Sequence, residues 1–151
     1  MMKKMKFISR RNALSILGAY GIAFSLPGVS QAGTEKVLSI VDDITSGNGT
    51  ELGDIYLDLP EIAENGNQVK VAFEIDSPMT VDNYVREVYI LADGNPAPKV
   101  AKFTFSPAMG ACAATTRMRL AKTQNVYILA GLNNGTYQMA QATVKVTIGG
   151  C

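Results

Sequence analysis

Residues 126–148 read Val-Tyr-Ile-Leu-Ala-Gly-Leu, then Asn-Asn-Gly-Thr, then Tyr-Gln-Met-Ala-Gln-Ala-Thr-Val-Lys-Val-Thr-Ile. The first run is strongly apolar, and the last is long and rich in residues that favour strands. Asn133-Asn134-Gly135 lies between them, and Asn and Gly accept the positive φ values of a type I′ turn. The stretch therefore predicts two antiparallel strands joined by a tight turn.

Strand signals continue upstream of this hairpin. Val69 to Ile75 alternates apolar and polar residues, which is typical of a strand with one buried face. Most of these runs end at or next to Pro, Gly, Asn or Asp, and the runs recur every 8–12 residues or so. The expected strands are 54–59, 69–75, 85–92, 100–105, 115–120, 126–132 and 137–148. This pattern predicts an all-β fold, an immunoglobulin-like antiparallel β-sandwich.

One helix is expected before the strands, over residues 35–46. Val37, Leu38, Val41 and Ile44 recur at helical spacing and share a face. Thr34 is the expected N-cap, and Gly47 the expected stop. Residues 33–148 thus form a single β-sandwich domain with one N-terminal helix.

Residues 1–32 have the pattern of an export signal. Five Lys and Arg residues precede the mostly apolar run 13–29, and Ser30-Gln31-Ala32 is typical of a signal peptidase site. Ser9-Arg10-Arg11 followed by Leu14 is similar to the twin-arginine export motif, although Ala13 stands where Phe is usual. We expect cleavage after Ala32 and a periplasmic protein. The apolar run is short for a membrane span, although an uncleaved anchor is the alternative.

Charge excludes some classes of partner. The chain has 14 basic and 13 acidic residues. Five basic residues and no acidic ones precede residue 33, which leaves nine against 13 and a net charge of −4. This balance argues against nucleic acid and anionic membranes. The chain has no histidine and two cysteines, which excludes a closed zinc site of soft ligands and acid–base catalysis by histidine.

The tail Gly149-Gly150-Cys151 is the candidate functional site. Two glycines without side chains predict a flexible arm over residues 149–151. Three extended residues span roughly 10 Å. Such an arm suits a carrier that presents covalent cargo on the Cys151 thiol. The alternative is a disordered tail whose cysteine is incidental.

Other candidates have simpler explanations. Cys112, in an expected loop of small residues, is interpreted as a partly buried free thiol, with a bridge to Cys151 as the alternative in an oxidising compartment. Arg117 and Arg119 alternate on a strand and could bind an oxyanion, but a solvated surface or a partner interface explains them better. Four methionines, Met79, Met109, Met118 and Met139, are too scattered to favour a copper site.

Several stretches resemble the SoxY family, the sulfur-carrier subunits of the bacterial Sox thiosulfate-oxidising system. They are Leu57-Asp-Leu-Pro-Glu-Ile-Ala-Glu-Asn-Gly-Asn67, Asp76-Ser-Pro-Met-Thr80, Ile90-Leu-Ala-Asp-Gly-Asn-Pro96, Arg117-Met-Arg-Leu120 and Val144-Lys-Val-Thr-Ile-Gly-Gly-Cys151. The resemblance implies that Cys151 carries the cargo, with Gly149 and Gly150 as its arm. It also implies no cofactor and no catalytic activity of the chain's own.

The resemblance further implies partners. SoxZ would form a heterodimer with this chain, the SoxAX cytochrome would couple thiosulfate oxidatively to the cysteine, SoxB would hydrolyse off sulfate, and SoxCD would in some organisms oxidise the remaining sulfur. Two features depart from the family: Gly-Gly commonly follows the cysteine there, and Cys112 is unexpected. Two other hypotheses are a structural or adhesive exported β-sandwich and a small metal-binding protein, the latter disfavoured because the chain has no histidine.

Overall fold

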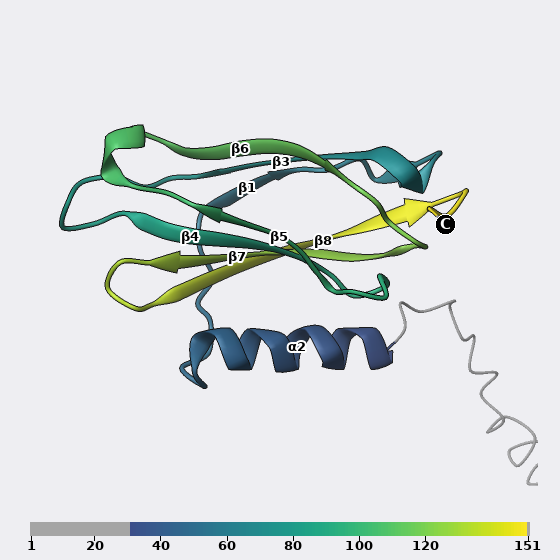
Figure 1. Cartoon of the computed structure of the whole chain (residues 1–151), viewed down its shortest axis with the longest axis horizontal. Helices are drawn as coiled ribbons and strands as arrows, with labels where there is room; N and C mark the ends of the chain where they lie inside the picture. Colours follow the sequence, from purple (N-terminus) through teal and green to yellow (C-terminus); the bar gives the residue numbers. More distant parts are fainter. Residues whose placement is uncertain (1–30, 151) are drawn as a thin grey trace, which may run out of the picture.

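The computed structural model describes residues 31–150. Residues 1–30, which belong to the predicted signal peptide, and Cys151 lie outside the described residues. Three layers make up this part of the chain: a three-stranded sheet, a five-stranded sheet and a helix on the outer face of the larger sheet (Figure 1). The elements are α2 (Gln31–Thr45), β1 (Ile55–Asp58), β2 (Ile62–Ala63), β3 (Val69–Ile75), β4 (Val85–Ala92), β5 (Lys99–Thr104), β6 (Cys112–Met118), β7 (Gln124–Leu132) and β8 (Tyr137–Val146).

The strand order is β1-β3-β6 in the small sheet and β2-β8-β7-β4-β5 in the large one. Neighbouring strands are antiparallel, except that the short β2 runs parallel to β8. The predicted immunoglobulin-like sandwich is confirmed. The predicted strand 115–120 begins earlier, because residues 112–114 pair with Ile75, Glu74 and Phe73 of β3. Cys112 therefore starts a strand and is not in a loop.

Apolar side chains between the two sheets form the main core. Alternation along β3 buries Val71, Phe73 and Ile75 and leaves Lys70 and Glu74 exposed, as the sequence predicts. The Phe73 ring meets Phe103 and Phe105 edge to face, with centroids 5.6 and 6.2 Å apart. These contacts link the small sheet to β5 and to the residue that follows it.

Helix α2 covers the other face of the large sheet. Val37 and Val41 pack against Leu91, Tyr127 and Leu129 in a second core. Strands β4 and β7 are therefore buried on both faces, which explains why residues 126–130 are continuously apolar. The helix begins four residues before the predicted start. Thr34, the expected N-cap, lies inside it, and its hydroxyl donates to Asp93 Oδ2 at 3.1 Å.

The predicted hairpin joins β7 to β8, but its turn is not of type I′. Gly135 has φ +89° and is the one loop residue with a positive φ. Gly135 N donates to Leu132 O at 3.1 Å, and Leu132 N donates to Thr136 O at 2.9 Å. This is a type I turn followed by a left-handed glycine, the usual three-residue hairpin loop. Asn134 Oδ1 accepts from the Thr136 amide, which fixes the loop without a positive φ at Asn134.

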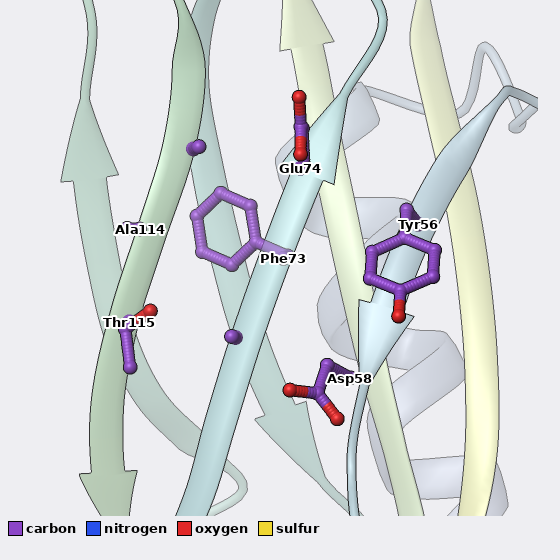
Figure 2. A pocket seen from close by; sticks show the side chains of 8 residues that line it. Tyr56, Asp58, Phe73, Glu74, Ala114 and Thr115 are labelled. Carbon is purple, nitrogen blue, oxygen red and sulfur yellow. The ribbon is translucent and has the colours of Figure 1, made fainter.

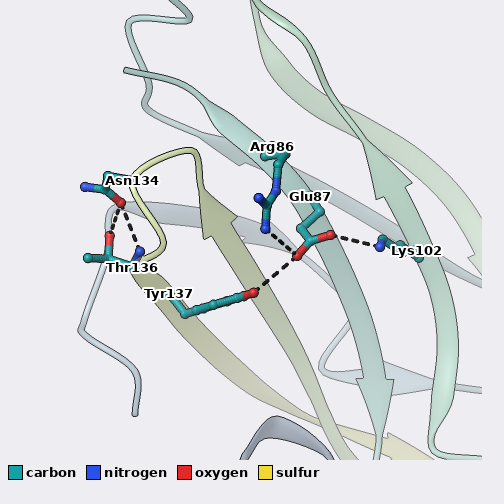
Figure 3. A network of polar contacts seen from close by, with 6 residues as sticks. All are labelled: Arg86, Glu87, Lys102, Asn134, Thr136 and Tyr137. Atoms are coloured by element: carbon teal, nitrogen blue, oxygen red, sulfur yellow. Dashed lines mark hydrogen bonds and ion pairs between the residues drawn. The ribbon is translucent and has the colours of Figure 1, made fainter. Parts of the chain in front are cut away.

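A carboxylate network lies on the large sheet beside the helix. Glu87 accepts from Lys102 Nζ at 2.8 Å, Arg86 at 3.3 Å and the Tyr137 hydroxyl at 3.2 Å (Figure 3). Lys102 Nζ also lies 5.0 Å from the centre of the Tyr89 ring. Burial alone would raise the pKa of Glu87, but the hydrogen bonds from Lys102 and Arg86 outweigh it and lower that pKa.

Glu87 should therefore make folding pH-dependent. A carboxyl group whose pKa falls on folding stabilises the protein above its unfolded pKa of about 4.3. This stability is lost as the pH falls through the folded pKa. Between pH 6 and pH 3.5 we expect the wild type to lose more unfolding free energy than Glu87→Gln, measured by urea unfolding. Equal losses in both proteins would contradict the prediction.

Candidate functional site at the end of the sandwich

The segment after β8 lies between two loops. Thr147 N donates to Ala63 O at 3.1 Å, and Gly66 N donates to Ile148 O at 2.8 Å. Farther along, Gly150 N donates to Leu120 O at 2.9 Å, while Leu120 N donates to Gly66 O at 2.8 Å. Backbone hydrogen bonds thus tie the C-terminal segment to the loop before β3 and to the loop after β6.

Three glycines make this junction possible. A Cβ on Gly149 would lie 2.2 Å from Ala121 O, and one on Gly66 would lie 2.2 Å from Leu120 O. On Gly150 it would lie 2.6 Å from Arg119 Cγ and 3.0 Å from Gly66 O. None of the three has a left-handed φ. Here glycine provides room for close approach, because any side chain would push the backbones apart.

The described part of the predicted arm is therefore packed. Gly150 is buried and Gly149 is half-buried, whereas the sequence predicts a flexible arm over residues 149–151. Gly150 packs there because its amide donates to Leu120 O on the neighbouring loop and because it has no side chain to prevent this close approach. Cys151 itself lies outside the described residues.

Asn95 holds the loop against which Gly150 packs. Its side-chain Nδ2 donates to Arg119 O at 2.8 Å, and its Oδ1 accepts from Ala121 N at 3.0 Å. Gln124, which is fully buried, donates to the same Oδ1 at 3.0 Å and accepts from Gly94 N at 2.7 Å. The loop is thus fixed on both sides of Leu120 by one asparagine.

Asp93, two residues before Asn95, ties this loop to the sheet and the helix. Its carboxylate accepts from the Asn125 amide at 2.9 Å, from the Tyr127 hydroxyl at 3.3 Å and from Thr34. Burial is the main cause that raises the pKa of Tyr127, with the Asp93 charge adding to it. The raised pKa keeps the Tyr127 hydroxyl protonated, so it can donate to the Asp93 carboxylate.

A hollow of about 310 Å³ opens beside Gly150. It is lined by Asn95, Pro96, Ala97, Arg119, Ala121 and Gly150. Lys36 of helix α2 reaches its rim, because Lys36 Nζ donates to Pro96 O at 3.3 Å. The surroundings of the chain end thus carry cationic side chains from two parts of the sequence.

This end of the sandwich is built from segments that are far apart in the chain. Asn65-Gly66-Asn67, Asp93-Gly-Asn-Pro96, the loop after Arg117-Met-Arg-Leu120 and Gly149-Gly150 all meet there. The family model for "Sulfur oxidation protein SoxY" matches residues 43–151, which contain all four. The chain belongs to the SoxY family. SoxY is a sulfur carrier protein, and the predicted resemblance is confirmed.

A solved SoxY has the same fold. It is the sulfur carrier protein SoxY from Chlorobium limicola f thiosulfatophilum, with 29% identity and a TM-score of 0.64, covering 76% of this chain and 99% of that one. A superoxide reductase (neelaredoxin) from Ignicoccus hospitalis follows with 18% identity and a TM-score of 0.56, covering 69% and 91% of the two chains. That likeness shows the fold alone. No curated protein sequence matches the chain.

The structure assigns positions that sequence analysis left without a role. Gly66, Asn95 and Gln124 build the junction, although no function was predicted for them. Two of the three, Gly66 and Asn95, fall in the stretches that carry the SoxY resemblance, which was the available signal. Arg119, which sequence analysis assigns to a solvated surface or a partner interface, is exposed, but it follows β6 and the stem of its side chain lies against Gly150.

Cys112 lies at the opposite end of β6 from this junction. Met118 lies six positions farther along the strand, roughly 20 Å away at 3.3 Å per residue. A disulfide needs Cα atoms about 4.4–6.8 Å apart. Gly150 is bonded to Leu120, beyond the Met118 end of β6, so it would have to leave the junction before a bridge between the two cysteines could form. Cys112 is a free, buried thiol.

Cys112 should be inert in the folded protein. Its side chain is 1% exposed, and burial raises the pKa of its thiol to about 11. At pH 8 we expect iodoacetamide to label Cys112 at least about 100-fold more slowly in native protein than in urea, because the thiolate is the reactive form. Peptide mass spectrometry measures this directly. Rapid native labelling of Cys112 would show that β6 opens at that end.

Two other hollows lie on the small sheet, and a third lies beside β2 and β8, lined by Glu61, Ile62, Thr143 and Lys145. One of those on the small sheet has a volume of about 380 Å³, and Tyr56, Asp58 and Glu74 stand around it (Figure 2). It shares no lining residue with the junction around Gly150. Across residues 31–150 no three His, Cys, Asp or Glu side chains gather as a metal site, and no helix there is long and apolar enough to cross a bilayer.

Proposed function

We propose that this protein is a periplasmic sulfur carrier that holds thiosulfate-derived sulfur on the Cys151 thiol. It is exported by the twin-arginine route, pairs with SoxZ and is acted on by the SoxAX cytochrome, by SoxB and, where present, by SoxCD. It supplies the attachment point and leaves the chemistry to these partner enzymes.

The loading step is an oxidation. The Cys151 thiolate and the terminal sulfur of thiosulfate form a sulfur–sulfur bond, and the two electrons released pass to the cytochrome. The adduct is Cys151–S–S–SO₃⁻. Water then attacks the sulfonate sulfur of this adduct, which releases sulfate and two protons and leaves a persulfide on the cysteine.

One observation carries the proposal: the SoxY family match runs through residue 151, and four of the five segments that carry the resemblance meet around the last described residue. A carrier thiol must enter several active sites in turn. Release of the arm therefore has to break backbone hydrogen bonds such as the one from Gly150 N to Leu120 O. Backbone hydrogen bonds contribute about 0.5–1.5 kcal/mol each.

The test is an intact-mass measurement. The reduced protein is incubated with thiosulfate and the SoxAX cytochrome, and peptide mapping locates the adduct. A gain of one thiosulfate on the C-terminal peptide is expected, and treatment with SoxB should then reduce that gain by loss of the sulfonate group. No adduct, or an adduct on Cys112, would contradict the proposal and favour the structural or adhesive alternative.

A further inference from the structure

The fold places a cation where the sequence shows none. Along the chain, Lys145 is the basic residue nearest to the C-terminal tail. In the structure the side chain of Arg119 lies against the penultimate residue: a Cβ built on Gly150 would be 2.6 Å from Arg119 Cγ and 3.2 Å from its Cδ. The guanidinium of Arg119 is thus carried on a stem that touches Gly150.

Arg119 forms no ion pair with another residue of the part of the chain that the structure describes. The ion pairs among residues 31–150 are Lys70–Asp58, Arg86–Glu87 and Lys102–Glu87. Within the described residues, the guanidinium of Arg119 takes part in no hydrogen bond, although its backbone carbonyl is held by Asn95. Its backbone is therefore fixed, its stem is packed on the chain end, and its charged group is available.

We infer that Arg119 is a positioning residue that favours the thiolate of Cys151 and attracts anionic sulfur substrates to it. The inference rests on the proposed carrier function. One peptide bond separates Cys151 from Gly150, and consecutive Cα atoms are about 3.8 Å apart. A guanidinium stays charged at any working pH. A positive charge close to a thiol favours its ionised form, and it raises the local concentration of thiosulfate, which is a dianion.

Other charges near the junction do not replace Arg119. Arg117 points to Gln68, since its NH1 donates to Gln68 Oε1 at 3.4 Å. The Asp93 carboxylate is occupied by Asn125, Tyr127 and Thr34. The remaining charged residues on the elements packed around the chain end are Lys36, Glu61, Glu64, Lys122 and Lys145. Lys36 reaches only the rim of the hollow beside Gly150, through its hydrogen bond to Pro96 O, whereas Arg119 lines the hollow next to Gly150.

The experiment compares alkylation of Cys151 in four full-length proteins: wild type, Arg119→Gln, Arg119→Lys and Arg117→Gln. Neutral iodoacetamide is used from pH 6 to pH 10, and peptide mass spectrometry separates Cys151 from Cys112. We expect Arg119→Gln to react about threefold more slowly at pH 7 and to reach the wild-type rate at high pH, because the exposed charge acts through solvent. Arg119→Lys should recover most of the rate, and Arg117→Gln should match the wild type.

A second reagent tests the attraction of anions. Iodoacetate carries a negative charge, so Arg119→Gln should slow it more than it slows iodoacetamide. In wild-type protein the iodoacetate-to-iodoacetamide rate ratio should fall between 20 mM and 1 M salt as charges are screened. Identical pH curves for wild type and Arg119→Gln, or equal slowing by Arg117→Gln, would overturn the inference. Neither reagent needs a Sox enzyme, so this result is independent of whether thiosulfate is the natural cargo.

Discussion

Cys151→Ser should abolish loading with thiosulfate and leave the fold unchanged. The hydroxyl of serine cannot form the sulfur–sulfur bond that stores the cargo, so the expected loss of adduct is complete. The last residue of a chain makes few packing contacts, and changes at such positions alter the unfolding free energy by no more than about 0.5 kcal/mol. Intact mass after incubation with thiosulfate and SoxAX gives the loading, and thermal unfolding gives the stability.

Cys112→Ala is the matched control for this substitution. Cys112 is the other thiol in the chain, and it is buried at the far end of β6. We expect this variant to load like the wild type, with only the modest loss of stability that follows when one buried sulfur atom is removed. Residual loading of Cys151→Ser at the wild-type level would place the attachment site elsewhere.

Gly66→Ala should destabilise the domain by about 2 kcal/mol and lower its melting temperature by roughly 8 °C. The added methyl carbon would lie 2.2 Å from Leu120 O, 2.8 Å from Gly150 N and 2.9 Å from Val146 Cγ1. Two of these atoms belong to backbone, so they cannot move aside without breaking hydrogen bonds. The loop before β3, the loop after β6 and the C-terminal segment should separate.

Hydrogen exchange at the Gly150 amide gives a second readout, because its bond to Leu120 O closes the junction. We expect exchange to be at least tenfold faster in Gly66→Ala. Asn67→Ala is the control, because Asn67 is exposed and next to Gly66. Its backbone N–H donates to Asn65 Oδ1, and the substitution keeps that hydrogen bond. Unchanged melting and exchange in Gly66→Ala would mean that the close approach of the three segments is not needed for folding.

The sequence by itself determined seven of the eight strands and their order along the chain, and only the two-residue β2 was not predicted. Alternation along Val69–Ile75 predicted the exact bounds of β3, since one face is buried and the other is exposed to solvent. The continuous apolar run 126–132 also predicted β7, which begins two residues earlier at Gln124, although the cause of that run, a helix covering the second face, was not visible. The export signal and the carrier role of the Cys151 thiol remain predictions from sequence, because residues 1–30 and Cys151 lie outside the described residues.

Only the tertiary structure decided what surrounds the chain end. A local pattern reports which face of a strand is buried, but it carries no information on contacts between residues 66, 95, 119 and 150. Gly149-Gly150 reads as a flexible arm because glycine lacks a side chain, and the same absence allows the close backbone approach that packs it. The positive charge of Arg119 beside the tail could not be predicted from the sequence either. Arg119 is remote in sequence from Gly150, and the loop that Asn95 holds brings its side chain to the penultimate residue.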